Sequence, residues 1–185
     1  MWKRLTITTL AFGLYTGAAP APINREPLWA GVRLYYGPGV GLTSLDVDLI
    51  GRAAKSIDLT AYVLKDRDVI VALTSAASRG AKVRVYLDPE QNSSREARPD
   101  GKLAALLRAP GVEARVKAAA GDPMHLKSYQ VDGRYLRTGS ANFSFSGEER
   151  QDNDIVIIES REAAGAFLAR FEEMWSRKSN LRLAP

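Results

Sequence analysis

The sequence predicts a single α/β domain in which helices flank one mixed β-sheet. Segments typical of strands alternate with segments that have helical spacing, and this alternation favours an α/β layer architecture. The chain has 185 residues, of which 45% are hydrophobic, so it can bury a sizeable core. A mean hydropathy of -0.20 excludes a multi-span membrane protein, and the apolar content excludes a largely disordered chain.

The first half of the chain is predicted to contain two strands and two helices. Glycines 37, 39 and 41 with Pro38 form a turn-rich break after the first strand. Apolar residues recur at helical spacing in the first helix, and Gly80 suits the C-terminal cap of the second. In order, the segments are strand 32–36, helix 45–55, strand 57–64 and helix 69–79.

The second half is predicted to add five strands and two helices. Asp132-Gly133 is a strong hairpin turn signal between two of these strands. The last helix carries an apolar stripe typical of core packing, formed by Ala163, Phe167, Leu168, Phe171, Met174 and Trp175. In order, the segments are strand 83–87, polar loop 89–101, helix 102–108, strands 112–116, 124–131, 134–138 and 155–158, and helix 162–177.

Composition excludes several classes of site. The chain has no cysteine, so it has no disulfide, thiolate zinc site, iron–sulfur cluster or cysteine nucleophile. His125 is its single histidine, which excludes zinc sites built from two or three histidines of one chain. A net charge of +5 and a pI near 9.6 favour anionic partners, either nucleic acid or a phospholipid surface.

Residues 1–21 have the three parts of a secretory signal peptide, which leaves residues 22–185 as the mature domain. Lys3 and Arg4 precede an apolar stretch of residues 5–19, and small residues and prolines follow. Export to a bacterial periplasm or the medium is therefore expected; an uncleaved anchor and a buried first helix are the alternatives. Removal of the segment would reduce the net charge from +5 to +3.

Four functional side chains are expected on one face of the predicted hairpin. His125 and Lys127 are two residues apart on a strand, so their side chains point the same way, and Ser140 and Asn142 repeat this spacing after Gly139. An imidazole can attack phosphorus while the ammonium, hydroxyl and amide hold the non-bridging oxygens, with no metal ion or cofactor. A lone histidine is usually structural, and Gly-Ser-x-Asn alone is a common turn, so the combination carries the argument.

The combined pattern resembles the HxK(x4)D(x6)GSxN motif of the phospholipase D superfamily, with both spacings kept. The matching residues are His125, Lys127, Asp132, Gly139, Ser140 and Asn142. The likeness extends over roughly residues 32–176 and implies the α-β-α sandwich of that superfamily. A short chain with one motif copy resembles the small bacterial endonucleases of the superfamily.

The resemblance implies a ping-pong mechanism through a phosphohistidine, in which a second histidine protonates the leaving oxygen. Because this chain has one histidine, two copies of His125 must meet in a homodimer with a composite site. Lys127 and Asn142 would bind phosphate oxygens, and Ser140 would form a hydrogen bond within the site. Asp132 belongs to the motif but stands at a strand end, where a structural or orienting role and a simple turn-forming role are both open.

One position departs from the family pattern. Small members carry a carboxylate about eleven residues after the motif asparagine, where it orients the histidine, but this chain has Asn153 there. Asp152 and Asp154 flank that position, and Asp154 is favoured because it leads directly into the next strand.

The motif does not choose between DNA, RNA and phospholipid. Arg134, Arg137 and Arg150, with Arg95 and Arg98 in the polar loop, are expected to form a cationic rim that binds substrate, although exposed arginines are often only solvated. A nonspecific endonuclease is the favoured function. A phospholipase D-type lipid hydrolase and a non-catalytic nucleic-acid-binding protein are the alternatives.

Overall fold

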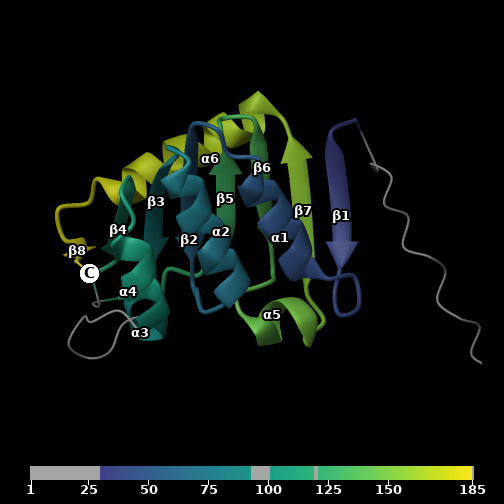
Figure 1. Cartoon of the computed structure of the whole chain (residues 1–185), viewed down its shortest axis with the longest axis horizontal. Coiled ribbons are helices and arrows are strands. Elements are labelled where there is room, and N and C mark those ends of the chain that lie inside the picture. The colour runs from purple at the N-terminus through teal and green to yellow at the C-terminus, as the bar shows by residue number, and fades with distance from the viewer. Residues whose placement is uncertain (1–29, 93–100, 119–120, 185) are drawn as a thin grey trace, which may run out of the picture.

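The computed structural model of the chain describes residues 30–92, 101–118 and 121–184, which form one mixed sheet flanked by helices (Figure 1). The strands of the described residues are β1 (Val32–Tyr36), β2 (Ser56–Ala61), β3 (Lys82–Leu87), β4 (Val112–Val116), β5 (Lys127–Val131), β6 (Tyr135–Gly139), β7 (Asp154–Glu159) and β8 (Leu181–Leu183). The helices are α1 (Leu42–Gly51), α2 (Arg67–Ser78), α3 (Pro89–Asn92), α4 (Gly101–Leu107), α5 (Phe145–Glu149) and α6 (Arg161–Trp175).

The strand order explains why the sheet is mixed. It runs β1-β7-β6-β5-β2-β3-β4-β8, with β2, β3 and β4 parallel and every other neighbouring pair antiparallel. The parallel strands are joined through helices, as parallel connections require, whereas β5 and β6 are joined by a hairpin turn. The predicted α/β class with a mixed sheet is thus confirmed.

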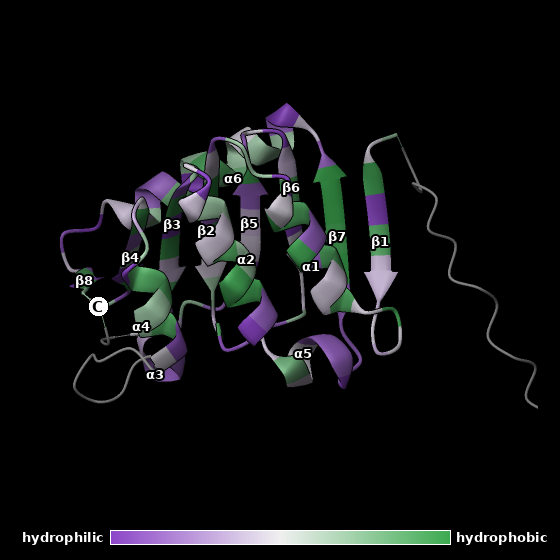
Figure 2. Ribbon diagram, viewed as in Figure 1, coloured by the Kyte–Doolittle hydropathy of each residue, from purple (hydrophilic) through white to green (hydrophobic). Residues whose placement is uncertain are grey.

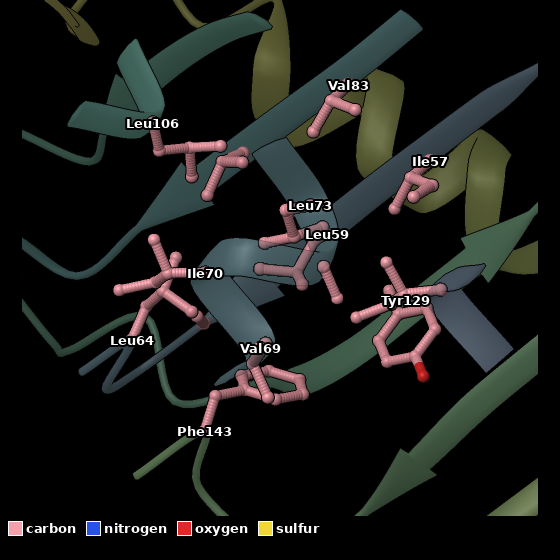
Figure 3. Close-up of a cluster of buried hydrophobic side chains, with 14 of the residues drawn as sticks. Ile57, Leu59, Leu64, Val69, Ile70, Leu73, Val83, Leu106, Tyr129 and Phe143 are labelled. Atoms are coloured by element: carbon pink, nitrogen blue, oxygen red, sulfur yellow. The ribbon is translucent and has the colours of Figure 1, made fainter. Parts of the chain in front are cut away.

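Two apolar layers hold the helices on opposite faces of the sheet. Helices α1, α2 and α4 lie on one face and α6 on the other (Figure 1). The main core lies under α1, α2 and α4 and includes Ile57, Leu59, Leu73, Val83 and Tyr129 (Figure 3). Hydropathy colouring shows most of β7 as apolar (Figure 2), in agreement with the four apolar residues between Asp154 and Glu159.

The last helix buries less of its stripe than its sequence suggests. Phe171, Met174 and Trp175 are buried against the sheet with Tyr86 and Met124. The other three residues of the predicted stripe are only half-buried, and Ala164 is buried instead. The apolar face is therefore concentrated at the C-terminal end of α6.

Three short elements were not predicted, and one of them is the four-residue α3, which lies in the segment predicted to be a polar loop. Helix α5 has five residues and begins at the N-cap Ser144, whose hydroxyl accepts a hydrogen bond from Gly147 N. Strand β8 has three residues and pairs with β4 at the edge of the sheet. Elements of this length carry too few residues to show a period.

Residues 1–21, predicted to be a signal peptide, lie outside the described residues. Among the helices that the structure does describe, none combines the length and apolarity needed to cross a lipid bilayer.

The hairpin places the motif at two opposite ends of the strands. Tyr129 pairs with Arg137, and the hydroxyls of Ser128 and Thr138 are 2.9 Å apart, so the start of β5 lies beside the end of β6. We call this the His125 end of the sheet. Asp132 follows the last residue of β5 and marks the opposite end, about 16 Å away at 3.3 Å per residue.

Candidate active site at the His125 end of the sheet

His125 is exposed and lies against the ammonium group of Lys127. The Lys127 Nζ is 3.0 Å from both ring nitrogens of His125 and donates a hydrogen bond to the His125 carbonyl at 2.8 Å. An ammonium can donate but cannot accept, so a ring nitrogen that accepts from it must carry a free lone pair. Lys127 is itself buried, and this burial lowers the pKa of its side chain. The pair therefore places the Lys127 ammonium directly beside the imidazole ring.

Tyr62 completes the surroundings of this pair. Its ring centroid is 4.5 Å from that of His125, and the Lys127 Nζ lies 4.8 Å from the same Tyr62 ring. The backbone N–H of Tyr62 donates to the Leu126 carbonyl at 2.9 Å, which ties the segment after β2 to the histidine. Sequence analysis did not identify Tyr62 as a site residue, because it lies inside the predicted strand 57–64 and only the pairing of β2 with β5 brings it to His125.

Ser140 is held by Asp154 at the end of β6. The Ser140 hydroxyl donates to Asp154 Oδ1 at 2.5 Å and accepts from Asp154 N at 2.9 Å, while Ser140 N donates to the same carboxylate at 3.1 Å. Asp154, predicted to orient His125, thus orients Ser140 in this structure, and no contact joins it to His125. No contact joins Asp152 to His125 either, and Asp152 lies in the exposed turn before β7.

Asn142 lies on the short segment between β6 and α5. Its side-chain Oδ1 is buried without a hydrogen-bond partner among the described residues, and its carbonyl accepts from Ser144 N at 2.7 Å. The next residue, Phe143, is buried, and its carbonyl accepts from the N–H groups of Lys65 and Asp66. The segment is therefore fixed, and within the described part of the chain no hydrogen bond engages the Nδ2 donors of Asn142.

Arg137 is fully buried, which corrects the prediction that it binds substrate. Its guanidinium pairs with both carboxylate oxygens of Asp46, at 2.9 and 2.7 Å, and both side chains have 0% exposure. Arg137 Nη1 also donates to the carbonyls of Lys127 and Ala141. Arg137 thus supports the backbone of the site from within the core.

A buried carboxyl group beside this ion pair has a raised pKa. Burial and the charge of Asp46 raise the pKa of Glu148 to about 8, and neither of its carboxyl oxygens has a hydrogen-bond partner among the described residues. Asp46, which also accepts from the Tyr129 hydroxyl at 2.8 Å, is the carboxylate that pairs with Arg137.

Asp132 and Arg134 lie at the opposite end of the sheet from His125. Arg134 pairs with Glu159 there, so the structure does not support its predicted contact with substrate. The Asp132 carboxylate accepts from the backbone N–H groups of Ala54, Lys55 and Ser56, at 2.8–2.9 Å. Burial alone would raise the pKa of Asp132, but these three N–H donors outweigh it and the pKa is lowered. This arrangement favours the structural alternative for Asp132.

Replacing Asp132 by alanine is expected to lower the free energy of unfolding by about 1–2 kcal/mol at pH 7, because three N–H groups lose their acceptor. The effect should appear in stability and not in kcat. The pKa of Asp132 is lower in the folded chain than in the unfolded chain. The stabilisation is therefore present above the ordinary pKa of an aspartate, and it is lost as the pH falls through the lowered value. Urea unfolding at pH 7 and pH 3 checks this; an equal loss at both would contradict it.

Of the remaining arginines that were predicted to form the cationic rim, only Arg150 lies among the described residues. Arg150 is exposed just after α5, at the His125 end, and its contact with substrate stays a prediction. Arg95 and Arg98 lie outside the described residues. Within the described part of the chain, no group of three or more histidine, aspartate or glutamate side chains has the arrangement of a metal site.

Comparisons with known proteins agree on one family. The sequence family described as "Cardiolipin synthase, PLD-like domain" matches residues 47–175. Phospholipase D of Rickettsia felis is 33% identical over 143 residues, which cover 77% of this chain and 68% of the relative. Mitochondrial cardiolipin hydrolase of Xenopus tropicalis is 29% identical over 127 residues, which cover 69% of this chain and 58% of the relative. The chain thus spans about two thirds of the length of the first relative and less than two thirds of the second.

A solved structure shares the fold. Nuc from Salmonella typhimurium, a phospholipase D family member, superposes with a TM-score of 0.74 at 24% identity, covering 83% of this chain and 98% of Nuc. The match confirms the predicted architecture of a single domain with a mixed sheet.

Proposed function

Because the chain belongs to the phospholipase D superfamily of phosphodiesterase-like proteins, we propose that it hydrolyses phosphodiesters without a metal ion, through a covalent phosphohistidine. The observation that carries this proposal is the exposed imidazole of His125, with the Lys127 ammonium 3.0 Å from its ring nitrogens. Lys127 and the free amide donors of Asn142 supply positive and polar groups for the phosphate oxygens at the same end of the sheet.

The chemistry proceeds in two balanced steps. A ring nitrogen of His125 attacks phosphorus, so an N–P bond forms while the P–O bond to the leaving group breaks, and a second, protonated imidazole gives its proton to the leaving oxygen. Water then attacks the phosphohistidine, the N–P bond breaks, and the second imidazole takes the proton from water. Lys127 stays close to the charge that develops on the non-bridging oxygens.

The second imidazole must come from another copy of the chain. Each chain has one histidine, and the mechanism needs a nucleophile and a general acid at the same phosphate. We therefore propose a homodimer with one composite site, in which His125 of one protomer attacks and His125 of its partner protonates. An inactive chain mixed in excess with the wild type should then abolish activity, because most dimers would hold one His125 at most.

The proposed substrate is nucleic acid, with the protein acting as a nonspecific endonuclease. A net charge of +5 favours a polyanionic backbone, and the resemblance to small single-motif endonucleases supports the same substrate. Phospholipid hydrolysis is the second candidate. It is favoured by the names of the curated relatives and by two apolar side chains exposed near the site, Leu126 at 40% and Phe145 at 64%.

The test is cleavage of plasmid DNA, RNA and phospholipid vesicles by the full chain in excess EDTA, beside the His125→Ala variant. We expect chelator-resistant nicking of nucleic acid, with a loss of about 10³-fold or more in the variant, because the nucleophile is gone. Arg161→Gln, at an exposed α6 residue, is the control and should keep wild-type activity.

Each other outcome has a definite meaning. Lipid cleavage without nucleic-acid cleavage would transfer the function to the second candidate. Activity that needs added Mg²⁺ and survives His125→Ala would refute the phosphohistidine mechanism. Nucleic-acid binding that is equal in both proteins, with no cleavage, would identify a binding protein.

A further inference from the structure

A cavity of about 300 Å³ opens directly beside His125 on the α6 side of the sheet. Three cations line it: Lys117, which follows β4, and Arg170 and Arg177 from α6 and its C-terminal end. Met124, Leu126 and Met174 supply its apolar lining. We call this cavity the basic pocket. No aspartate or glutamate is among its lining residues in the described chain.

The walls of the basic pocket are held in place. Met124 N donates to Asp88 Oδ2 at 2.9 Å, which fixes the segment that leads to His125. Met124 and Met174 are buried in the same cluster as Phe171 and Trp175. Arg177 lies beside the Tyr86 hydroxyl, where its charge partly offsets the increase that burial causes in the pKa of Tyr86. The apolar lining of the pocket and Arg177 thus lie on a packed surface.

The existing partners of these cations leave them able to bind an anion. Arg170 pairs with Glu173 at 2.7 Å, but both side chains are more than half exposed, and such surface pairs are weak. Lys117 donates to the carbonyl of Asp122, which is neutral. Arg170 and Lys117 therefore remain able to bind an anion.

We propose that the basic pocket binds a second phosphate of the substrate, one that flanks the phosphodiester attacked by His125. This inference rests on the proposed function and names the subsite that would distinguish a nucleic-acid strand from an isolated diester. A strand offers further phosphates on both sides of the bond that is cut, and the apolar lining suits the sugar between them. A lipid that has two phosphates is the competing occupant.

The test uses thymidine dinucleotides with no terminal phosphate, a 5′-phosphate or a 3′-phosphate. One terminal phosphate should lower the KM of the wild type about tenfold, which is the range of one charge-assisted contact. In the double variant Lys117→Gln/Arg170→Gln, the ratio of the KM values without and with the terminal phosphate should fall to nearly one. The control Arg52→Gln/Arg161→Gln also loses two exposed cations, outside the pocket, and should keep the wild-type ratio of KM values.

The outcomes separate the pocket from the proposed function. Cleavage of bis-p-nitrophenyl phosphate, which has one phosphate, reports the chemistry of His125 alone. If the wild type cleaves it but neither terminal phosphate changes the KM of the dinucleotide, the pocket inference is overturned. If it cleaves no diester at all, the proposed function fails first. Faster cleavage of cardiolipin than of phosphatidylglycerol vesicles, lost in the pocket variant while dinucleotides show no phosphate effect, would assign the pocket to lipid.

Discussion

Replacing Arg137 by methionine is expected to destabilise the fold by about 3–5 kcal/mol, because it leaves the Asp46 carboxylate buried without its counterion. The same change removes a donor from the carbonyls of Lys127 and Ala141, so activity should fall although Arg137 cannot contact a substrate. Urea unfolding gives the free energy, and kcat per folded molecule measures the second effect.

Arg134→Met is the matched control for this experiment. It removes the same charge from a pair with Glu159 that is largely exposed, at the opposite end of the sheet. Stability should change far less, since surface ion pairs contribute little. Equal losses in the two variants would show that the burial of the Arg137–Asp46 pair is not what makes it important.

Replacing Gly139 by alanine is the second change with a large expected effect. Gly139 has a φ of +143°, and an added Cβ would lie 2.3 Å from the Asp154 carbonyl oxygen and 3.0 Å from the Ile155 Cα. These contacts are with backbone, so the chain itself must move, and the shift would disturb the bonds between Ser140 and Asp154. We expect a loss of about 3 kcal/mol or more in the free energy of unfolding, and reduced activity.

Gly133→Ala separates steric crowding from backbone conformation. Gly133 also has a positive φ, of +63°, but an added Cβ there would meet no atom within 4 Å. Its cost should be about 1 kcal/mol, the conformational term alone. Thermal unfolding of both variants makes the comparison, and a Gly133→Ala loss as large as that of Gly139→Ala would contradict the close-approach argument.

The hairpin and the contact between His125 and Lys127 follow from local signals. Asp132-Gly133 marks the turn, and the spacing between His125 and Lys127 predicts a shared face, which agrees with the 3.0 Å separation of their side chains. Strand β5 begins only at Lys127, so His125 precedes the strand that was expected to contain it. Boundaries of this kind depend on pairing with β2 and not on local pattern.

Charge alone does not indicate which arginines face the substrate. The sequence did not distinguish between Arg134, Arg137 and Arg150. The structure places Arg134 at the end of the sheet opposite His125, Arg137 in the core and Arg150 at the His125 end. Arg137 is buried because Asp46, 91 residues away in sequence, supplies its counterion. No spacing rule connects two residues so far apart.

The sequence by itself determined the family, the α/β class and the identity of the motif residues, because each rests on a local pattern of residue types. Only the tertiary structure shows that Asp154 binds Ser140 and that Tyr62 packs against His125. It also places Asp132 at the end of the sheet opposite His125. It also gathered Lys117, Arg170 and Arg177 into one pocket. These contacts join segments that are distant in sequence, and only the packing of α6 and the order of the strands brings them together.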